Sequence, residues 1–223
     1  MNCILVGDRS VIGSALGRHL SNDGWNVIGQ NKTSHPSLWD KVEPWDFLLC
    51  SIGSLGPVGH WSERNLFNGP FLNATYPIKE VQVFWRKHAP NAKICFLAGG
   101  NPNKTMPSYV AYQMGKACLI KAVENMDAET PDATIFTLSP GFVPTRFHQP
   151  TLEAGIKDVR LENPPPVADY IPRIYECLKW CLQQPKEVLG GRNIHVNDPW
   201  DKGNELAARL ALNPNLYKLR RAE

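Results

Sequence analysis

A tyrosine and a lysine four residues apart, Tyr112 and Lys116, are the side chains of this sequence with the clearest chemical potential. In an α-helix this spacing puts the phenol and the ammonium on one face, about one turn apart. A free phenol, with a pKa of about 10, is a poor base at neutral pH, whereas a neighbouring ammonium stabilises the phenolate and lowers that pKa. The pair therefore indicates acid–base chemistry on one helix face.

The amino terminus has a second chemical feature, a glycine-containing turn in the stretch ILVGDRSVIGSAL. Gly7 and Gly13 flank this turn, and Ser10 or Val11 stands where a middle glycine would be. Such a turn between a strand and a helix brings backbone amides up to a pyrophosphate, and glycine is needed where a side chain would block the approach. We therefore predict a dinucleotide-binding turn, with cofactor contacts from Gly7, Arg9, Ser10, Ile12 and Gly13.

The end of the second predicted strand bears on the choice of dinucleotide. An acidic residue about 20 positions after the turn accepts hydrogen bonds from the ribose hydroxyls of NAD. Here the sequence has Gln30, Asn31 and Lys32 and no carboxylate. Lys32, together with Arg9, would attract a 2′-phosphate, so we assign Asn31 and Lys32 to the cofactor site and expect NADP, with NAD as the alternative. The other interpretation of Lys32 is an ordinary surface lysine.

The elements that position these residues alternate along the chain. Short, continuously apolar runs are typical of strands that are covered on both faces. We predict such strands at Cys3–Val6, Asn26–Gly29, Asp46–Ser51, Ala92–Ala98, Thr134–Ser139 and Arg192–Val196. Helices are predicted at Val11–Asp23, Ser62–His88, Tyr109–Ala128 and Pro166–Gln184. The alternation predicts an α/β fold, a Rossmann-like doubly wound parallel sheet between two layers of helices.

Chain length and one short interval refine this fold. The 223 residues suit a single NAD(P)-binding domain, residues 1–223, with a tail from about residue 199 that could add one short helix. Only about 15 residues separate Asn31 from Asp46, too few for another strand of about five residues and two crossovers of about ten or more. We therefore expect that one edge strand is lost between the second strand and Asp46.

Further segments give the sequence a resemblance to the short-chain dehydrogenase/reductase family over nearly the whole chain. DFLLCSIGSLGP resembles the family's fourth strand and its Asn-Asn-Ala-Gly segment, of which Gly53 matches best and Ser51 is a replacement. Asn73, in FLNATYP, is placed like the asparagine of the catalytic tetrad, and GGRNIHVND resembles the last strand. LSPGFVPTRF resembles the Pro-Gly segment after the sixth strand. The resemblance implies cofactor contacts from Ser51, Gly53, Tyr112, Lys116, Pro140, Gly141, Val143 and Thr145.

The resemblance implies hydride transfer between a nicotinamide cofactor and a carbonyl or alcohol. Tyr112 would act as general acid in reduction and as general base in oxidation, assisted by Lys116, which in the family also holds the nicotinamide ribose. Asn73 would connect the lysine to a proton-relay water. The alternative interpretation of Tyr112 and Lys116 is a pair on the surface of a helix.

One hydroxyl that the resemblance requires is absent. The family's serine, which hydrogen-bonds the substrate oxygen, should lie about thirteen residues before the tyrosine, where the sequence reads ICFLAGGNPN. Losing one such donor costs roughly 100- to 1000-fold in rate. The possible substitutes are the backbone amides of Gly99 and Gly100, the side chain of Asn101, and Ser139.

Three functions are compatible with these features. The first is an NAD(P)-dependent oxidoreductase in which a substitute replaces the serine. The second is a cofactor-binding sensor or structural protein with little or no turnover, which the absent serine and the reduced glycine turn favour. A sugar-nucleotide epimerase or reductase of the extended branch fits less well, because only about 80 residues follow Gly141 and leave little room for its substrate domain.

The loop from Pro144 to Val167 should cover the active site, because ligands of open α/β sheets lie beyond the carboxyl ends of the strands. Phe147, Leu152 and Ile156 in this loop indicate a partly apolar substrate. We interpret His148 as a solvated loop histidine rather than as a substrate contact.

Composition bears on partners and location. A hydrophobic fraction of 43%, a charged fraction of 20% and a net charge of +3 are typical of a soluble globular protein and do not favour nucleic acid or a membrane as a partner. The chain opens without a secretory signal, so we expect a cytoplasmic protein.

Six scattered cysteines without histidines at ligand spacing predict no metal site. Extra apolar positions on the helices from Ser62 and Tyr109 predict a homodimer or homotetramer.

Overall fold

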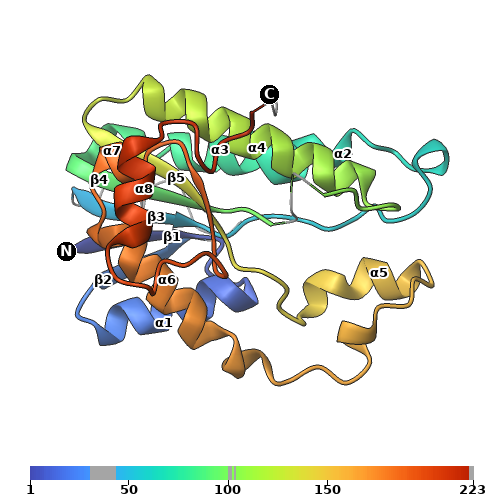
Figure 1. Cartoon of the computed structure of the whole chain (residues 1–223). Coiled ribbons are helices and arrows are strands. Elements are labelled where there is room, and N and C mark those ends of the chain that lie inside the picture. The colour runs from blue at the N-terminus through green and yellow to red at the C-terminus, as the bar shows by residue number, and fades with distance from the viewer. Residues whose placement is uncertain (31–43, 100–101, 103, 221–223) are drawn as a thin grey trace.

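The structure, a computed structural model, describes residues 1–30, 44–99, 102 and 104–220 and consists of a sheet between two layers of helices (Figure 1). The described strands form a six-stranded parallel sheet in the order β2-β1-β3-β4-β5-β6. They are β1 (Asn2–Val6), β2 (Asn26–Gln30), β3 (Trp45–Cys50), β4 (His88–Leu97), β5 (Ala133–Ser139) and β6 (Asn193–His195). The predicted α/β fold is confirmed, and each strand lies at a predicted apolar run.

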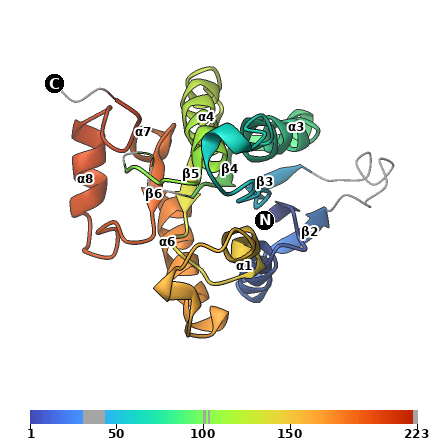
Figure 2. The same ribbon diagram turned by 90° about the vertical axis from the view of Figure 1, so that its right-hand side faces the viewer.

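Helices cover both faces of the sheet. On one face lie α1 (Val11–Asn22) and α6 (Ile171–Gln183), and on the other lie α3 (Tyr76–Gln82) and α4 (Val110–Ala128) (Figure 2). Neighbouring residues of one strand therefore enter different cores: Leu5 belongs to the core on the α1 and α6 side, and Ile4 to the core on the α3 and α4 side. This explains why the strands are continuously apolar rather than alternating.

The prediction of one helix over Ser62–His88 is wrong. The segment contains a turn at Trp61–Glu63, the short α2 (Asn68–Pro70), a π-helical turn at Phe71–Thr75 and then α3. The helix ends near Phe84, whose carbonyl accepts from the Lys87 N–H in a tight turn and also from the indole N–H of Trp45 at 3.0 Å. Because these two donors use that carbonyl, the chain leaves the helical path and enters β4 four residues before the predicted strand.

The carboxyl-terminal tail folds back onto the sheet. It carries α8 (Glu205–Leu212), the short helix that we predicted, and α7 (Lys186–Leu189) lies beside it. The Arg192 guanidinium is buried and donates to the carbonyls of Leu210, Asn213 and Leu216. These bonds tie the tail to the start of β6, at the edge of the sheet farthest from β2.

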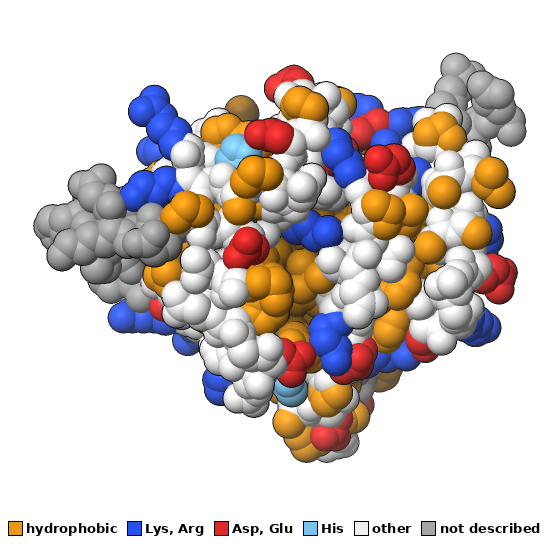
Figure 3. Space-filling view, turned by 90° about the vertical axis from the view of Figure 1, so that its left-hand side faces the viewer, with side chains coloured by type: hydrophobic (Ala, Val, Ile, Leu, Met, Phe, Trp, Pro, Cys, Tyr) orange, Lys and Arg blue, Asp and Glu red, His pale blue; other side chains and the backbone are white. Residues whose placement is uncertain are grey.

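Residues 31–43, where we predicted the loss of an edge strand, lie outside the described residues, as do the candidate cofactor residues Asn31 and Lys32. In the part of the chain that is described, every helix is too short or too polar to span a bilayer. Figure 3 views the molecule from the amino ends of the strands, where basic and acidic side chains are mixed around a central apolar area. This face therefore differs from the continuous basic surface that nucleic acids bind.

Candidate active site

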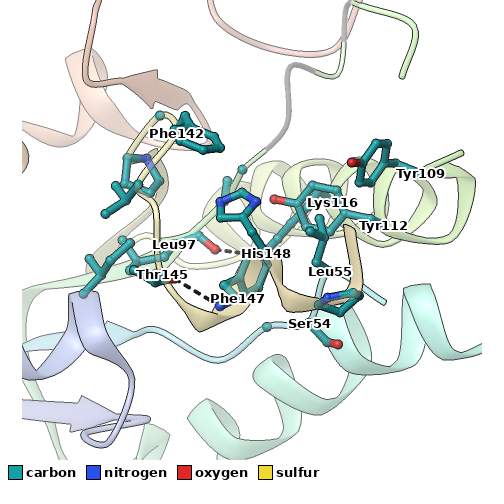
Figure 4. A pocket seen from close by; sticks show the side chains of 18 of the residues that line it. Ser54, Leu55, Leu97, Tyr109, Tyr112, Lys116, Phe142, Thr145, Phe147 and His148 are labelled. Atoms are coloured by element: carbon teal, nitrogen blue, oxygen red, sulfur yellow. Dashed lines mark hydrogen bonds between the residues drawn. The ribbon is translucent and has the colours of Figure 1, made fainter. Parts of the chain in front are cut away.

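A cavity of about 830 Å³ opens at the carboxyl ends of the strands, the edge at which open α/β sheets bind ligands. Its walls come from the turn after β1, the segments after β3 and β4, the first turns of α4, and the loop after β5 (Figure 4). The loop after β5 folds over the opening through a turn at Arg146–His148 and the short helix α5 (Gln149–Glu153). The loop that we predicted to cover the active site, Pro144–Val167, thus lies over this cavity.

Tyr112 and Lys116 both line this cavity and lie one turn apart on α4. Their exposed fractions are 5% and 3%, so the alternative of a surface pair is wrong. The Lys116 Nζ donates to the Leu97 carbonyl at the end of β4 at 2.9 Å and lies 6.0 Å from the centroid of the Tyr112 ring. Burial lowers the pKa of Lys116 to about 8. Burial also raises the pKa of Tyr112, so it outweighs the lowering that we expected from the ammonium.

Asn73 lies beside this pair, in the π-helical turn before α3. Its fully buried side chain accepts from the Ser54 N–H at 3.0 Å and donates to the Ser54 carbonyl at 2.8 Å, and it also donates to the Gly69 carbonyl. A Cβ added to Gly53 would lie 3.1 Å from Asn73 Oδ1 and 3.3 Å from Lys116 Nζ. The three residues predicted as catalytic are therefore brought together, and the Asn73 side chain fixes the segment after β3.

Two glycines allow the helices that carry these residues to cross closely. A Cβ on Gly69 would collide with the Ala111 carbonyl, and a Cβ on Gly115 would collide with the Gly69 carbonyl and approach Asn73 Cβ to 2.7 Å. Backbone thus packs against backbone where α2 meets α4. This close crossing sets the distance between Asn73 and the two residues on α4.

The place predicted for the missing serine is occupied by Gly99, immediately beyond β4 in the chain. A Cβ on Gly99 would collide with the Tyr112 hydroxyl oxygen and would lie 3.5 Å from Cζ of the ring. The hydroxyl of Tyr112 therefore occupies space that a serine side chain would need. Among the substitutes considered, Gly100 and Asn101 lie outside the described residues. Ser139 is buried in β5 and donates to Asn193 at 2.9 Å, away from the cavity lining, so it is not a substitute.

The predicted dinucleotide turn is held by a chain of hydroxyl groups. The Ser10 Oγ caps α1 by accepting from the Gly13 N–H at 2.9 Å, and it donates to the Ser51 Oγ at 2.8 Å. The Ser51 Oγ donates in turn to the Gly7 carbonyl at 2.8 Å. Gly7 has a φ of +87°, and a Cβ there would lie 2.8 Å from Ser51 Oγ, so both the backbone conformation and the contact require glycine.

Most of the other predicted cofactor residues also reach the cavity. Its lining includes Ser10, Ile12, Ser51, Gly53, Pro140, Gly141, Val143 and Thr145. The Thr145 Oγ1 accepts from the Phe147 N–H at 3.2 Å and so starts the turn that leads into the covering loop. Arg9 is exposed and does not line the cavity.

Comparison with known proteins gives a likeness in three dimensions only. No family model matches the sequence, and no curated protein matches it. A short chain dehydrogenase family protein from Francisella tularensis superposes with a TM-score of 0.68 at 16% identity, over 90% of this chain and 98% of that chain. An alcohol dehydrogenase from Thermococcus sibiricus, complexed with 5-hydroxy-NADP, superposes with a TM-score of 0.66 at 16% identity, over 87% of this chain and 94% of that chain. The oxidoreductase yciK from E. coli superposes with a TM-score of 0.71 at 14% identity, over 88% of this chain and 94% of that chain.

The chain has the short-chain dehydrogenase fold. The Tyr112 and Lys116 pair, the glycine turn and the segment from Pro140 to Thr145 all lie at the carboxyl ends of the strands of this fold. Within the described residues, no cluster of three or more His, Cys, Asp or Glu side chains could hold a metal ion.

From the sequence we named Phe147 but missed the other members of an aromatic wall on one side of the cavity. Tyr109, Phe142, Phe147 and His148 all line the cavity. His148 is half-buried and lies 4.6 Å from the Phe142 ring, and burial lowers its pKa, so the interpretation as a solvated loop histidine is wrong. Leu152 is exposed and does not contribute to the wall. Tyr109 is three residues before Tyr112 on the same helical stretch, and that spacing was the signal that could have found it.

His195 is a second residue that was missed. It ends β6 and lines the cavity near Gly141, whose added Cβ would lie 3.9 Å from His195 Nε2. Its Nδ1 accepts from the Asn197 N–H at 3.0 Å, so in the neutral ring Nε2 carries the hydrogen. Burial lowers the pKa of His195 and keeps it neutral, which makes Nε2 a hydrogen-bond donor beside the Pro-Gly segment. Its position at the carboxyl end of a strand was the available signal.

Proposed function

We propose that the protein is an NADP-dependent oxidoreductase that transfers a hydride between the cofactor and a carbonyl or alcohol group of a small molecule. The observation that carries this proposal is the position of Tyr112 and Lys116 in one cavity, with Asn73 buried behind the segment that follows β3. The glycine turn and the Pro140–Thr145 segment line or adjoin the same cavity. The Thermococcus sibiricus alcohol dehydrogenase, which has a similar fold, was obtained with 5-hydroxy-NADP.

The residues of the amino-terminal turn fit a dinucleotide. The helix α1 begins there with its amino terminus toward the turn. Gly7 and Gly13 leave room for the Ser51 hydroxyl, which packs against both and keeps the turn tight. Ser10 and Ile12 line the adjoining cavity and would hold the pyrophosphate side of the cofactor. When bound, the cofactor supplies or accepts the hydride.

The Tyr112 hydroxyl would donate the proton that a reduced carbonyl oxygen takes up. Because burial raises the pKa of Tyr112, the phenol form is kept, and this form suits reduction better than oxidation. Lys116 would stabilise the phenolate left behind, since its ammonium is buried nearby and competes with little water. Asn73 would hold the segment after β3 against which the lysine packs.

The burial of Lys116 predicts a descending pH dependence. Its pKa of about 8 means that the ammonium is present below that pH and is lost above it. Because the pKa of Tyr112 is raised, the phenol stays protonated through the same range. We expect kcat/KM for reduction to be level at lower pH and to fall about tenfold per pH unit above about pH 8. Lys116→Arg should abolish this decrease at high pH. A level profile for the wild-type protein up to about pH 10 would contradict this role for Lys116.

The proposed function is tested by binding and turnover together. NADPH binding is measured by its fluorescence, and turnover by loss of NADPH absorbance with a panel of aldehydes, ketones and quinones. The competing function, a cofactor-binding protein without turnover, is favoured by one observation, the contact of the Tyr112 hydroxyl with Gly99 where a second donor would stand. Binding without turnover on any acceptor would select that function instead.

The cofactor preference needs its own titration. Lys32 favours NADP, whereas the Asp8 carboxylate lies against β2, where a Cβ on Gly29 would be 2.7 Å from its Oδ2. A carboxylate near this strand end favours NAD, because it repels a 2′-phosphate. We expect NADPH to bind more tightly than NADH, and Lys32→Ala to remove the difference. Tighter binding of NADH would identify Lys32 as an ordinary surface lysine.

We also propose a homodimer formed through α2, the π-helical turn and α4. Phe67, Phe71 and Met114 are exposed by 87%, 53% and 42% on these adjacent segments. Burying them in a twofold interface would remove apolar area from water. Sedimentation should give a dimer at micromolar concentration, and Met114→Glu should shift it to monomer. A wild-type monomer under these conditions would contradict the proposed interface.

The cytoplasmic location of the protein stays a prediction.

A further inference from the structure

The rings on the substrate side of the cavity form one continuous wall that ends at Tyr112. The Phe147 ring is 5.9 Å from the Tyr112 ring, edge to face, and 5.7 Å from His148. His148 in turn lies 4.6 Å from Phe142. Each step is within the range in which aromatic rings attract one another, so the wall is a packed unit rather than a set of separate side chains.

The two ends of this wall are anchored to the rest of the protein. The Arg160 guanidinium lies 4.2 Å from the centroid of the Phe142 ring and is held by two hydrogen bonds to the Asp158 carboxylate, of 2.9 and 2.6 Å. At the Tyr112 end, Tyr109 packs on the cluster that contains Tyr112, and its hydroxyl donates to the Thr151 Oγ1 at 3.1 Å, which joins the start of α4 to α5. Contacts within the protein therefore hold the wall, and its shape suits a flat apolar molecule.

Apolar side chains surround the Tyr112 ring on its other sides. Leu55 and Val58 are buried against it, and Ile156 and Ala154 of the covering loop pack on the same cluster. Leu55 and Ile156 also line the cavity. The lining around the Tyr112 ring is therefore aromatic and aliphatic, which favours an apolar group beside the reacting carbonyl. Charged side chains also line the same cavity: Lys104, Arg146, Lys157, Asp158 and Arg160.

The Gly99 position adds a requirement on reactivity. Gly99 brings no side-chain donor to the substrate oxygen, and Tyr112 already fills the space beside it. When hydride adds to a carbonyl carbon, negative charge develops on the oxygen, and each missing donor raises the barrier. An electron-poor ring withdraws electron density from the carbonyl carbon and from the developing alkoxide, so such a carbonyl needs less help from the protein. Such an acceptor compensates for the missing donor through its own electronic structure.

We infer that the substrate is a planar, electron-poor aromatic carbonyl compound, a quinone or an activated aryl aldehyde or ketone, an inference that rests on the proposed oxidoreductase function. In the reaction the hydride of the reduced nicotinamide forms a C–H bond at the carbonyl carbon, and the C=O π pair moves to oxygen. The Tyr112 hydroxyl gives its proton to that oxygen. An aldehyde or ketone is thereby reduced by two electrons to an alcohol, and the nicotinamide is oxidised. A quinone first becomes a hydroxy-ketone; loss of the new C–H proton to water and uptake of a proton by the second carbonyl oxygen then give the hydroquinone.

The experiment compares acceptors that differ in electron demand and shape. With saturating NADPH, kcat/KM is measured for para-substituted benzaldehydes from methoxy to nitro, for phenanthrenequinone, and for cyclohexanone. We expect a rise of about 30-fold or more from the methoxy to the nitro compound, high activity on the quinone, and the lowest activity on cyclohexanone. Equal rates across the series, or a preference for cyclohexanone, would overturn the substrate class while leaving the oxidoreductase function in place. No turnover on any acceptor would overturn both.

A variant separates the aromatic wall from general reactivity. Phe147→Ala should lower kcat/KM for phenanthrenequinone about tenfold or more, because one ring of the wall is lost, and should change that for diacetyl, a small activated dicarbonyl, much less. Leu152→Ala is the matched control, because Leu152 lies on the same loop but is exposed and outside the cavity lining. If Phe147→Ala lowers kcat/KM equally for both acceptors, the wall positions Tyr112 rather than the substrate. The inference that the substrate is planar would then fail.

Discussion

Tyr112→Phe is expected to remove almost all turnover while leaving NADPH affinity nearly unchanged. The substitution deletes one oxygen and keeps the ring that packs against Leu55, Val58 and Phe147, so the fold of the cavity wall is preserved. What is lost is the proton donor, and general acid catalysis contributes roughly 100- to 10,000-fold. We therefore expect kcat to fall by about 1000-fold in steady-state reduction of an aryl aldehyde.

Tyr109→Phe is the matched control for that experiment. Tyr109 is a second phenol on the same wall, but its hydroxyl is bound to the Thr151 Oγ1 and serves the contact with the covering loop. Its loss should cost less than about tenfold in kcat, the scale of one neutral hydrogen bond. Equal losses in the two variants, or an unchanged rate in Tyr112→Phe, would contradict the assignment of Tyr112 as the acid.

Sequence patterns predicted the sheet well because the burial of each strand is recorded in its own residues. The run ILV in β1 is continuously apolar since its side chains enter cores on both faces of the sheet. The segment over Ser62–His88 failed because its breaks depend on distant partners. The indole N–H of Trp45, in β3, donates to the Phe84 carbonyl, and the backbone of Ala111, in α4, packs against Gly69. Such contacts leave no periodic signal in the segment itself.

The candidate site divides in the same way. Tyr112 and Lys116 could be predicted from helical spacing, Asn73 was implied by the resemblance to short-chain dehydrogenase/reductases, and the structure brings the three together. Phe147 was named from the sequence, but the rest of the aromatic wall could not be predicted, because the loop after β5 places its rings through tertiary contacts such as that of Arg160 with Phe142. The raised pKa of Tyr112 was also missed, since it depends on burial rather than on sequence spacing.

Gly99 stands about where the resemblance places the family's serine. On the resemblance alone, Gly99→Ser would be expected to restore a missing donor and raise the rate. In the structure, any Cβ at this position collides with the Tyr112 hydroxyl oxygen. The ring has little room to retreat, because Leu55 and Val58 are packed against it and α4 is held at its close crossing with α2.

We therefore expect both Gly99→Ala and Gly99→Ser to lower turnover, by about 100-fold, since a displacement of the reacting group by about 1 Å costs that much. NADPH affinity and the thermal unfolding midpoint, measured beside the kinetics, distinguish a displaced Tyr112 from a damaged fold, because overpacking alone costs about 1 to 3 kcal/mol. Gly56→Ala is the control, since its added Cβ would lie at an ordinary 3.6 Å from Pro150. A serine variant faster than wild type would mean that Tyr112 moves aside readily and that the site retains the geometry of a two-donor mechanism. A slower serine variant with normal cofactor binding would mean that this site requires glycine at position 99, because the Tyr112 hydroxyl occupies the space that a side chain would need.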